Sequence, residues 1–123
     1  MSKKLDIVKN HLFKGIEDTG CYTSDDFKKF SREFKSMINE ELKSVGGVEY
    51  KQNTGHYFIS GFFKVNEQPY YISISDVRYC YPENINLLIR TAKDYKDFHG
   101  GNNHYIPLMD LEGDIFKGRL PRA

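Results

Sequence analysis

The most regular apolar pattern in the chain lies between residues 24 and 45. Apolar side chains recur there every three or four residues, which is the spacing of one face of an α-helix. Ser24 precedes the pattern as a capping residue, and Gly46-Gly47 follows it as a sequence suited to the positive φ of a helix end. The pattern therefore predicts an amphipathic helix over about residues 24–45. Its apolar face consists of Phe27, Phe30, Phe34, Met37, Ile38, Leu42 and Val45.

A shorter helical pattern occupies about residues 2–14. Leu5, Val8 and Leu12 fall on one stripe, and lysines make most of the remaining surface basic. The sequence thus predicts two N-terminal helices. An apolar stripe rich in Phe is typical of a helix that packs on a core, so we expect these helices to pack on a sheet.

Two strand-like segments, residues 56–65 and 70–78, form the centre of the predicted sheet. Both are rich in Tyr, Phe, Ile and Val, and the sequence Asn-Glu-Gln-Pro at 66–69 favours a turn between them. A four-residue loop fixes the register of the predicted hairpin. It pairs Val65 with Tyr70, Phe63 with Ile72, Gly61 with Ile74, Ile59 with Asp76 and Tyr57 with Arg78.

Side chains alternate between the faces of a strand, so this register gives the hairpin a core face and a second face. Gly61 on the core face leaves room for a helix to approach. On the second face, Phe58 and Phe62 are either covered by the N-terminal helix or the C-terminal tail, or form an exposed platform for a partner. The core face holds Tyr57, Ile59, Phe63, Val65, Tyr70, Ile72 and Ile74, and the second face holds Phe58, Ser60, Phe62, Tyr71, Ser73 and Ser75.

Shorter patterns complete the predicted fold. Asn53-Thr54-Gly55 is typical of a tight turn between a strand at 48–52 and the central hairpin. Further strands are predicted over about residues 87–92 and 105–108, and residues 110–120 predict one helical turn. Hairpin-length connections favour an antiparallel sheet. We therefore predict a single domain, 1–123, of the α+β class, with a mainly antiparallel sheet of four to five strands and two helices packed on it.

Composition narrows the classes of function. The 18 basic and 17 acidic residues give a net charge of +1, which argues against an acidic nucleic-acid mimic and against a strongly basic nucleic-acid binder. Two cysteines, Cys21 and Cys80, are too few for a disulfide scaffold and are typical of reduced thiols in a cytosolic protein. The sequence shows neither a signal peptide nor an apolar run that could span a membrane.

Candidate chemistry concentrates in residues 90–104, which read RTAKDYKDFHGGNNH. His99 beside Asp94 could act as a general acid or base, but no nucleophile is marked nearby. His99 and His104 match no zinc spacing, so neither a metal nor a cofactor is predicted. Arg90, like Arg78, is either a contact residue or the partner of a nearby aspartate in a structural ion pair.

Residues 70–108 read YYISISDVRYCYPENINLLIRTAKDYKDFHGGNNHYIPL. This segment resembles small proteins of phages and mobile elements in low-GC bacteria, and the whole chain is similar to anti-CRISPR proteins in size and composition. The resemblance implies a compact cytosolic inhibitor that binds a nuclease complex of the bacterial host. Anti-CRISPR proteins share no common motif, so the resemblance identifies no site residues.

The first hypothesis is accordingly a non-enzymatic inhibitor from a phage or mobile element that blocks a CRISPR-type nuclease complex by direct binding. Arg and Tyr are favoured at protein interfaces, so we expect the partner to bind residues 90–104 together with the nearby Arg78, Tyr79 and Tyr81. One alternative is a nucleic-acid-binding module that stacks bases on Phe58, Phe62 and Tyr71 and contacts phosphates through basic patches at the termini. Another is a small nuclease or hydrolase centred on His99. The predicted partner-binding residues are Arg78, Tyr79, Tyr81, Arg90, Lys93, Tyr95, Lys96, His99, Asn102 and Asn103.

Overall fold

The computed structural model describes residues 3–14, 25–54, 58–74, 85–92, 103–111, 115–116 and 120. The predicted class is confirmed: these residues form two helices and a five-stranded antiparallel sheet, so the fold is α+β. The elements are α1 (Lys3–Lys14), α2 (Asp25–Lys43), β1 (Val48–Thr54), β2 (Ile59–Val65), β3 (Gln68–Ile74), β4 (Asn86–Thr91), β5 (Asn103–Pro107) and the short 3-10 helix η2 (Leu108–Asp110).

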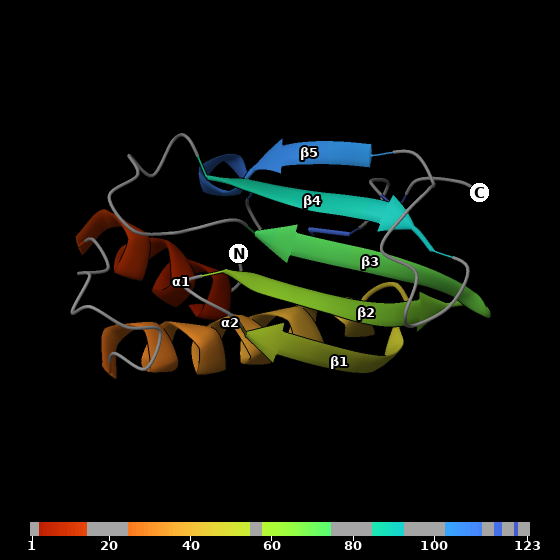
Figure 1. The fold of residues 1–123 in the computed structure, drawn as a ribbon, viewed down its shortest axis with the longest axis horizontal. Helices are drawn as coiled ribbons and strands as arrows, with labels where there is room; N and C mark the ends of the chain where they lie inside the picture. The colour runs from red at the N-terminus through yellow and green to blue at the C-terminus, as the bar shows by residue number, and fades with distance from the viewer. Residues whose placement is uncertain are drawn as a thin grey trace.

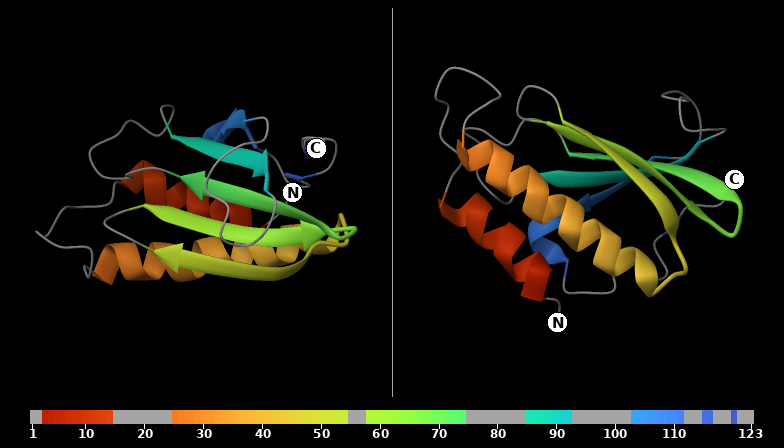
Figure 2. Two further views of the ribbon diagram at one scale, coloured as in Figure 1. Left: turned by 45° about the vertical axis from the view of Figure 1, so that its right-hand side comes forward. Right: turned by 90° about the horizontal axis from the view of Figure 1, so that it is seen from below.

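The sheet is an antiparallel meander in which each strand pairs with the next in sequence. The order is β1-β2-β3-β4-β5, so β1 and β5 are the edge strands (Figure 1). Figure 2 shows α1 and α2 next to each other on the same side of the sheet. One buried apolar cluster contains side chains from both helices and from β2, β3 and β4.

The end of α2 follows from its two glycines. Gly46 adopts a φ of +70°, which a residue without Cβ reaches at little cost. The N–H of Gly47 donates to the carbonyl of Leu42 at 2.8 Å, and that of Gly46 to Lys43 at 3.4 Å, which is the hydrogen-bond pattern of a Schellman cap. The helix ends at Lys43 and residues 44–46 form a turn, so Ser44 and Val45, the last two residues of the predicted range 24–45, lie beyond the helix.

The predicted register of the central hairpin is wrong by two residues. The loop consists of Asn66 and Glu67 alone, and both have positive φ, 51° and 72°, as a type I′ turn requires. Gln68 and Pro69 instead begin β3, with Val65 opposite Gln68. Because the error is an even number of residues, the division into faces survives. The buried face carries Ile59, Phe63, Val65, Tyr70, Ile72 and Ile74, as predicted.

The predicted turn at Asn53-Thr54 is also wrong, because β1 continues through both residues to pair with Ser60 and Ile59 of β2. Earlier in β1 the register shifts between Val48 and Lys51, where two residues of β1 lie opposite one of β2. Glu49 within this bulge has a φ of 58°.

The space over Gly61 is filled by β1 and not by a helix, contrary to the sequence prediction. A Cβ on Gly61 would lie 2.5 Å from Cε1 of Tyr50 and 2.9 Å from its hydroxyl. The bulge offsets Tyr50 from the regular register, and its ring covers the glycine. Gly61 is therefore required by a strand-to-strand contact.

The chain after β5 contributes more to the core than the sequence suggests. Its apolar side chains at 108, 111, 115 and 116 are fully buried, and the ring of Phe116 lies 5.1 Å from that of Phe63. The N–H of Ile115 donates to Oε2 of the buried Glu41 at 3.3 Å, and Lys9 donates to the carbonyl of Leu111. Leu111 thus contacts α1, and Ile115 contacts α2.

Candidate functional site

Among the predicted partner-binding residues, Arg90 is the one whose side chain the structure describes. It lies in β4, opposite Tyr71 of β3. Asn103 begins β5 and pairs with Arg90, and of this residue only the backbone is described. The remaining predicted residues, Arg78, Tyr79, Tyr81, Lys93, Tyr95, Lys96, His99 and Asn102, lie outside the described residues.

Arg90 belongs to a row of cations and aromatic rings on the second face of the sheet. Its guanidinium carbon lies 4.5 Å from the centre of the Tyr71 ring, which is cation–π geometry. The Tyr71 ring in turn lies 5.0 Å from that of Phe62, and Lys51 pairs with Phe62 on the next strand. We name Lys51, Phe62, Tyr71 and Arg90 the second-face row. The register places these four side chains side by side across β1 to β4.

The second face is neither wholly covered nor wholly exposed. Phe62 is only 2% exposed, whereas Phe58 is 44% exposed. Tyr105 of β5, which pairs with Leu88 beside the second-face row, is 64% exposed. A base can stack only on an accessible ring face, so the burial of Phe62 removes the central ring of the nucleic-acid alternative.

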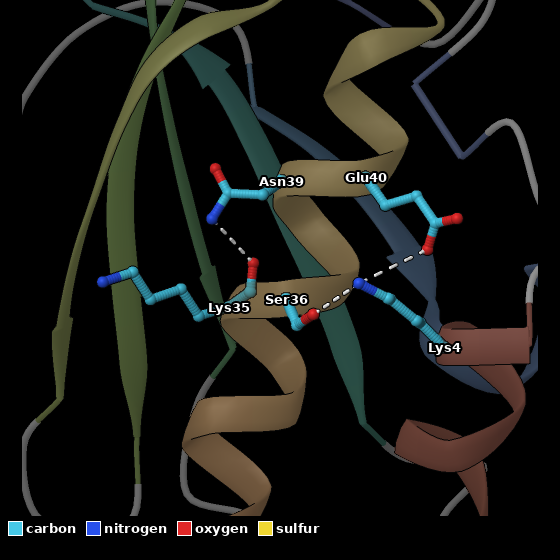
Figure 3. Close-up of polar contacts among 5 residues, drawn as sticks. All are labelled: Lys4, Lys35, Ser36, Asn39 and Glu40. Atoms are coloured by element: carbon cyan, nitrogen blue, oxygen red, sulfur yellow. Dashed lines mark hydrogen bonds and ion pairs between the residues drawn. The ribbon is translucent and has the colours of Figure 1, made fainter.

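The charges of α2 are divided between its two flanks. On the flank that meets α1, His11 pairs with Glu33, and Lys4 donates to Ser36 at 2.7 Å and lies 4.0 Å from Glu40. Figure 3 shows Glu40 reaching toward Lys4 while the Lys35 side chain leaves α2 on the opposite side. Glu33 and Glu40 therefore meet α1, whereas Lys35, with Lys28 and Arg32 at helical spacing from it, lies on the other flank.

That basic flank borders a cleft between α2 and the edge strand β1. The cleft has a volume of about 380 Å³ and opens to solvent. Its walls combine cationic, hydroxyl and amide side chains with one buried ring. The lining residues are Phe27, Lys28, Ser31, Arg32, Lys35, Gln52 and Thr54. We name it the α2–β1 cleft.

A chain of hydrogen bonds fixes the two walls of the α2–β1 cleft relative to each other. The hydroxyl of Tyr50 donates to Oε1 of Gln52 at 2.6 Å, and Nε2 of Gln52 donates to the backbone carbonyl of Ser31 at 3.0 Å. Gln52 thereby links β1 to α2. Burial raises the pKa of the Tyr50 phenol far above its ordinary value, because the phenolate would lose its hydration.

The raised pKa predicts how stability changes with pH. The folded state holds the Tyr50 proton more tightly than the unfolded state, so this contribution is complete below about pH 10 and is lost as the pH rises further. Burial raises the pKa of Tyr70 in the same direction. Urea unfolding should therefore show a free energy that falls above about pH 10.

Tyr50→Phe isolates the Tyr50 contribution. At neutral pH we expect it to lower the free energy of unfolding by about 1 kcal/mol, since Gln52 loses a hydrogen bond. Above about pH 10 its stability should fall less steeply than that of the parent. Tyr105→Phe, at a tyrosine that is 64% exposed, is the control and should change the free energy of unfolding little at neutral pH. Parallel curves for Tyr50→Phe and the parent would exclude Tyr50 as the titrating group.

The α2–β1 cleft was not predicted from the sequence. Lys28, Arg32 and Lys35 show the i, i+4, i+7 spacing of one helix flank, so the basic stripe itself was visible. A charged stripe is usually only a solvated surface. What distinguishes this stripe is the position of β1 beside it, which depends on the five-strand order.

In the described part of the chain, no three side chains of His, Cys, Asp or Glu gather where they could hold a metal ion. His99 and its neighbours, on which the hydrolase alternative depends, are outside that part. Neither described helix is long and apolar enough to cross a membrane.

No protein-family model matches the chain, and no curated protein or solved structure matches it.

Proposed function

We propose that this protein is a non-enzymatic inhibitor from a phage or mobile element that binds and blocks a CRISPR-type nuclease complex in the cytoplasm of its bacterial host. The nuclease complex is implied by the resemblance of residues 70–108 to proteins of that kind. In this proposal the two helices pack on one face of the sheet as a scaffold, and the partner meets the second face.

The observation that carries the proposal is the placement of Arg90 on the ring of Tyr71, beside the exposed Tyr105. The guanidinium carbon of Arg90 lies 4.5 Å from the centre of the Tyr71 ring, and this contact restricts the side chain before any partner binds. Arg90 therefore loses less conformational entropy on binding. Tyr105 is 64% exposed on the neighbouring edge strand. Rigid Tyr and Arg side chains are the residues most often found as anchors of protein interfaces.

The test is affinity capture from a lysate that contains a CRISPR-type nuclease complex, with the captured protein and nucleic acid identified by mass spectrometry. We expect the parent chain to retain nuclease subunits. The double variant Arg90→Glu/Lys93→Glu should weaken binding by about thirtyfold or more, as the loss of an interface anchor does. The affinities would be measured by titration of the purified complex.

Two further variants separate binding from folding. Arg90→Glu also loses its contact with Tyr71, which we expect to cost about 1 kcal/mol of stability. Tyr105→Ala removes an exposed ring, so it should weaken partner binding while leaving the melting temperature unchanged. Lys29→Glu, on an exposed position of α2, is the matched charge control and should bind like the parent. Equal affinity of the parent, Tyr105→Ala and the double variant would contradict the proposal.

A further inference from the structure

The α2–β1 cleft concentrates positive charge along one helix flank. Lys28, Arg32 and Lys35 all line it, and the rise of an α-helix separates successive members of this set by about 6 and 4.5 Å along the axis. Among the described residues that line the cleft, none is acidic. An anion in the cleft would therefore meet three cationic side chains.

The acidic side chains described on α2 do not cancel this charge. Glu33 pairs with His11 and Glu40 with Lys4, both on the α1 flank. Glu41 is buried and accepts the N–H of Ile115. On β1, Glu49 lies 3.6 Å from Lys64 and does not line the cleft.

Ser31 supplies an independent observation. Its side chain is part of the cleft wall and is 8% exposed, and its Oγ has no hydrogen-bond partner among the described residues. A buried hydroxyl without a partner destabilises a fold, so such groups need an explanation. A change of the χ1 rotamer is the movement that would bring this hydroxyl to an oxygen atom bound in the cleft.

We infer that the α2–β1 cleft binds a phosphate group. A phosphate monoester presents three strong acceptor oxygens around a tetrahedral phosphorus and a backbone phosphodiester presents two, whereas the two oxygens of a carboxylate lie in one plane. The donors that line the cleft suit a tetrahedral group, since the guanidinium of Arg32 can bind two oxygens and the lysines and the Thr54 hydroxyl offer further donors, joined by the Ser31 hydroxyl after its change of χ1. The phosphate belongs either to a small phosphorylated molecule or to the backbone of a nucleic-acid strand.

This inference does not rest on the proposed function. The α2–β1 cleft lies on the helix side of the sheet, whereas Arg90 and Tyr71 lie on the second face. Phosphate binding also does not require the Phe62 ring to be accessible, because the donors lie on α2 and on the edge strand β1. Failure of one proposal would leave the other intact.

Two probes distinguish the sources of the phosphate. Pyrophosphate, titrated by calorimetry against the full chain, represents a small ligand. A fluorescein-labelled single strand of polythymidine DNA, followed by anisotropy at low ionic strength, represents a nucleic-acid backbone. A peptide of consecutive glutamates tests whether any anion suffices.

Matched variants locate the binding. Arg32→Glu should weaken binding of the phosphate probe by about tenfold or more, because it removes charge-assisted hydrogen bonds and adds repulsion. Lys29→Glu makes the same change of charge on the same helix away from the cleft, and it should change affinity by less than about twofold. Ser31→Ala should weaken binding several-fold without lowering the melting temperature, since it removes a buried hydroxyl that has no partner.

Binding of pyrophosphate that Arg32→Glu abolishes supports a site for a small phosphorylated ligand. Binding of the DNA strand alone, with the same sensitivity, supports a site for a nucleic-acid backbone. Three results would overturn the inference: no binding of either probe, equal losses in Arg32→Glu and Lys29→Glu, or tighter binding of the glutamate peptide than of both probes. Unchanged affinity in Ser31→Ala would also overturn it, because the cleft would then be only a basic helix flank.

Discussion

Phe34→Ala should lower the free energy of unfolding by about 3–5 kcal/mol, which is most of the stability of a domain of this size. Phe34 is completely buried, and its ring lies 6.1 Å from that of Phe30 within the cluster shared by both helices and the sheet. Truncation removes the apolar contacts and leaves a cavity that the neighbouring rings cannot fill. Urea denaturation followed by circular dichroism measures the change.

Phe58→Ala is the control for Phe34→Ala. Phe58 is 44% exposed, so its truncation should cost less than about 1 kcal/mol. A destabilisation by Phe34→Ala no greater than that by Phe58→Ala would mean that the face of α2 carrying Phe34 is not packed in the core.

Gly61→Ala has the second largest expected effect, a loss of about 1–3 kcal/mol for the addition of one methyl group. The new Cβ would lie 2.5 Å from Cε1 of Tyr50 and 3.0 Å from the backbone oxygen of Lys51. The Tyr50 ring must therefore move, which breaks its hydrogen bond to Gln52 and loosens the link between β1 and α2. Chemical denaturation gives the magnitude.

A double-mutant cycle identifies the cause of the Gly61→Ala effect. In a Tyr50→Ala background the ring is absent, so Gly61→Ala should cost at least about 1 kcal/mol less than it does in the parent. The contact with the Lys51 oxygen remains, so some cost should persist. If the two costs simply add, the ring of Tyr50 does not determine the requirement for glycine.

Periodicity was sufficient to predict the two helices, the strands and the core-facing sides of α2 and of the central hairpin. The Phe-rich stripe of α2 has six members from Phe27 to Leu42 at the spacing of one helix face, and each of them is buried. The fold class follows from such patterns together with the short connections between strands. Apolar residues recur at a regular spacing because one face of each element is buried, so the spacing reveals that face.

Register could not be predicted in the same way. The choice between a two-residue and a four-residue turn depends on positive φ at Asn66 and Glu67, and the second of these residues is not a typical choice. The bulge at Glu49, which places Tyr50 over Gly61, has no distinct sequence signal. The burial of Leu111 and Phe116 was missed because no regular pattern connects them.

Of the second-face row, only Arg90 was among the predicted partner-binding residues. Arg90 was identified from its residue type, and the structure adds the ring on which it rests. The α2–β1 cleft requires an edge strand to lie beside a basic helix flank, and the sequence does not specify that juxtaposition.

Inhibition of target cleavage tests the central claim most directly. The parent chain would be added in increasing amounts to a purified CRISPR-type nuclease complex that it captures, together with guide and labelled target DNA. We expect cleavage to fall and to stop near one molecule of this protein per complex, and Tyr105→Ala to require a higher concentration. Cleavage that continues unchanged at saturating protein would contradict the claim that this chain is an inhibitor.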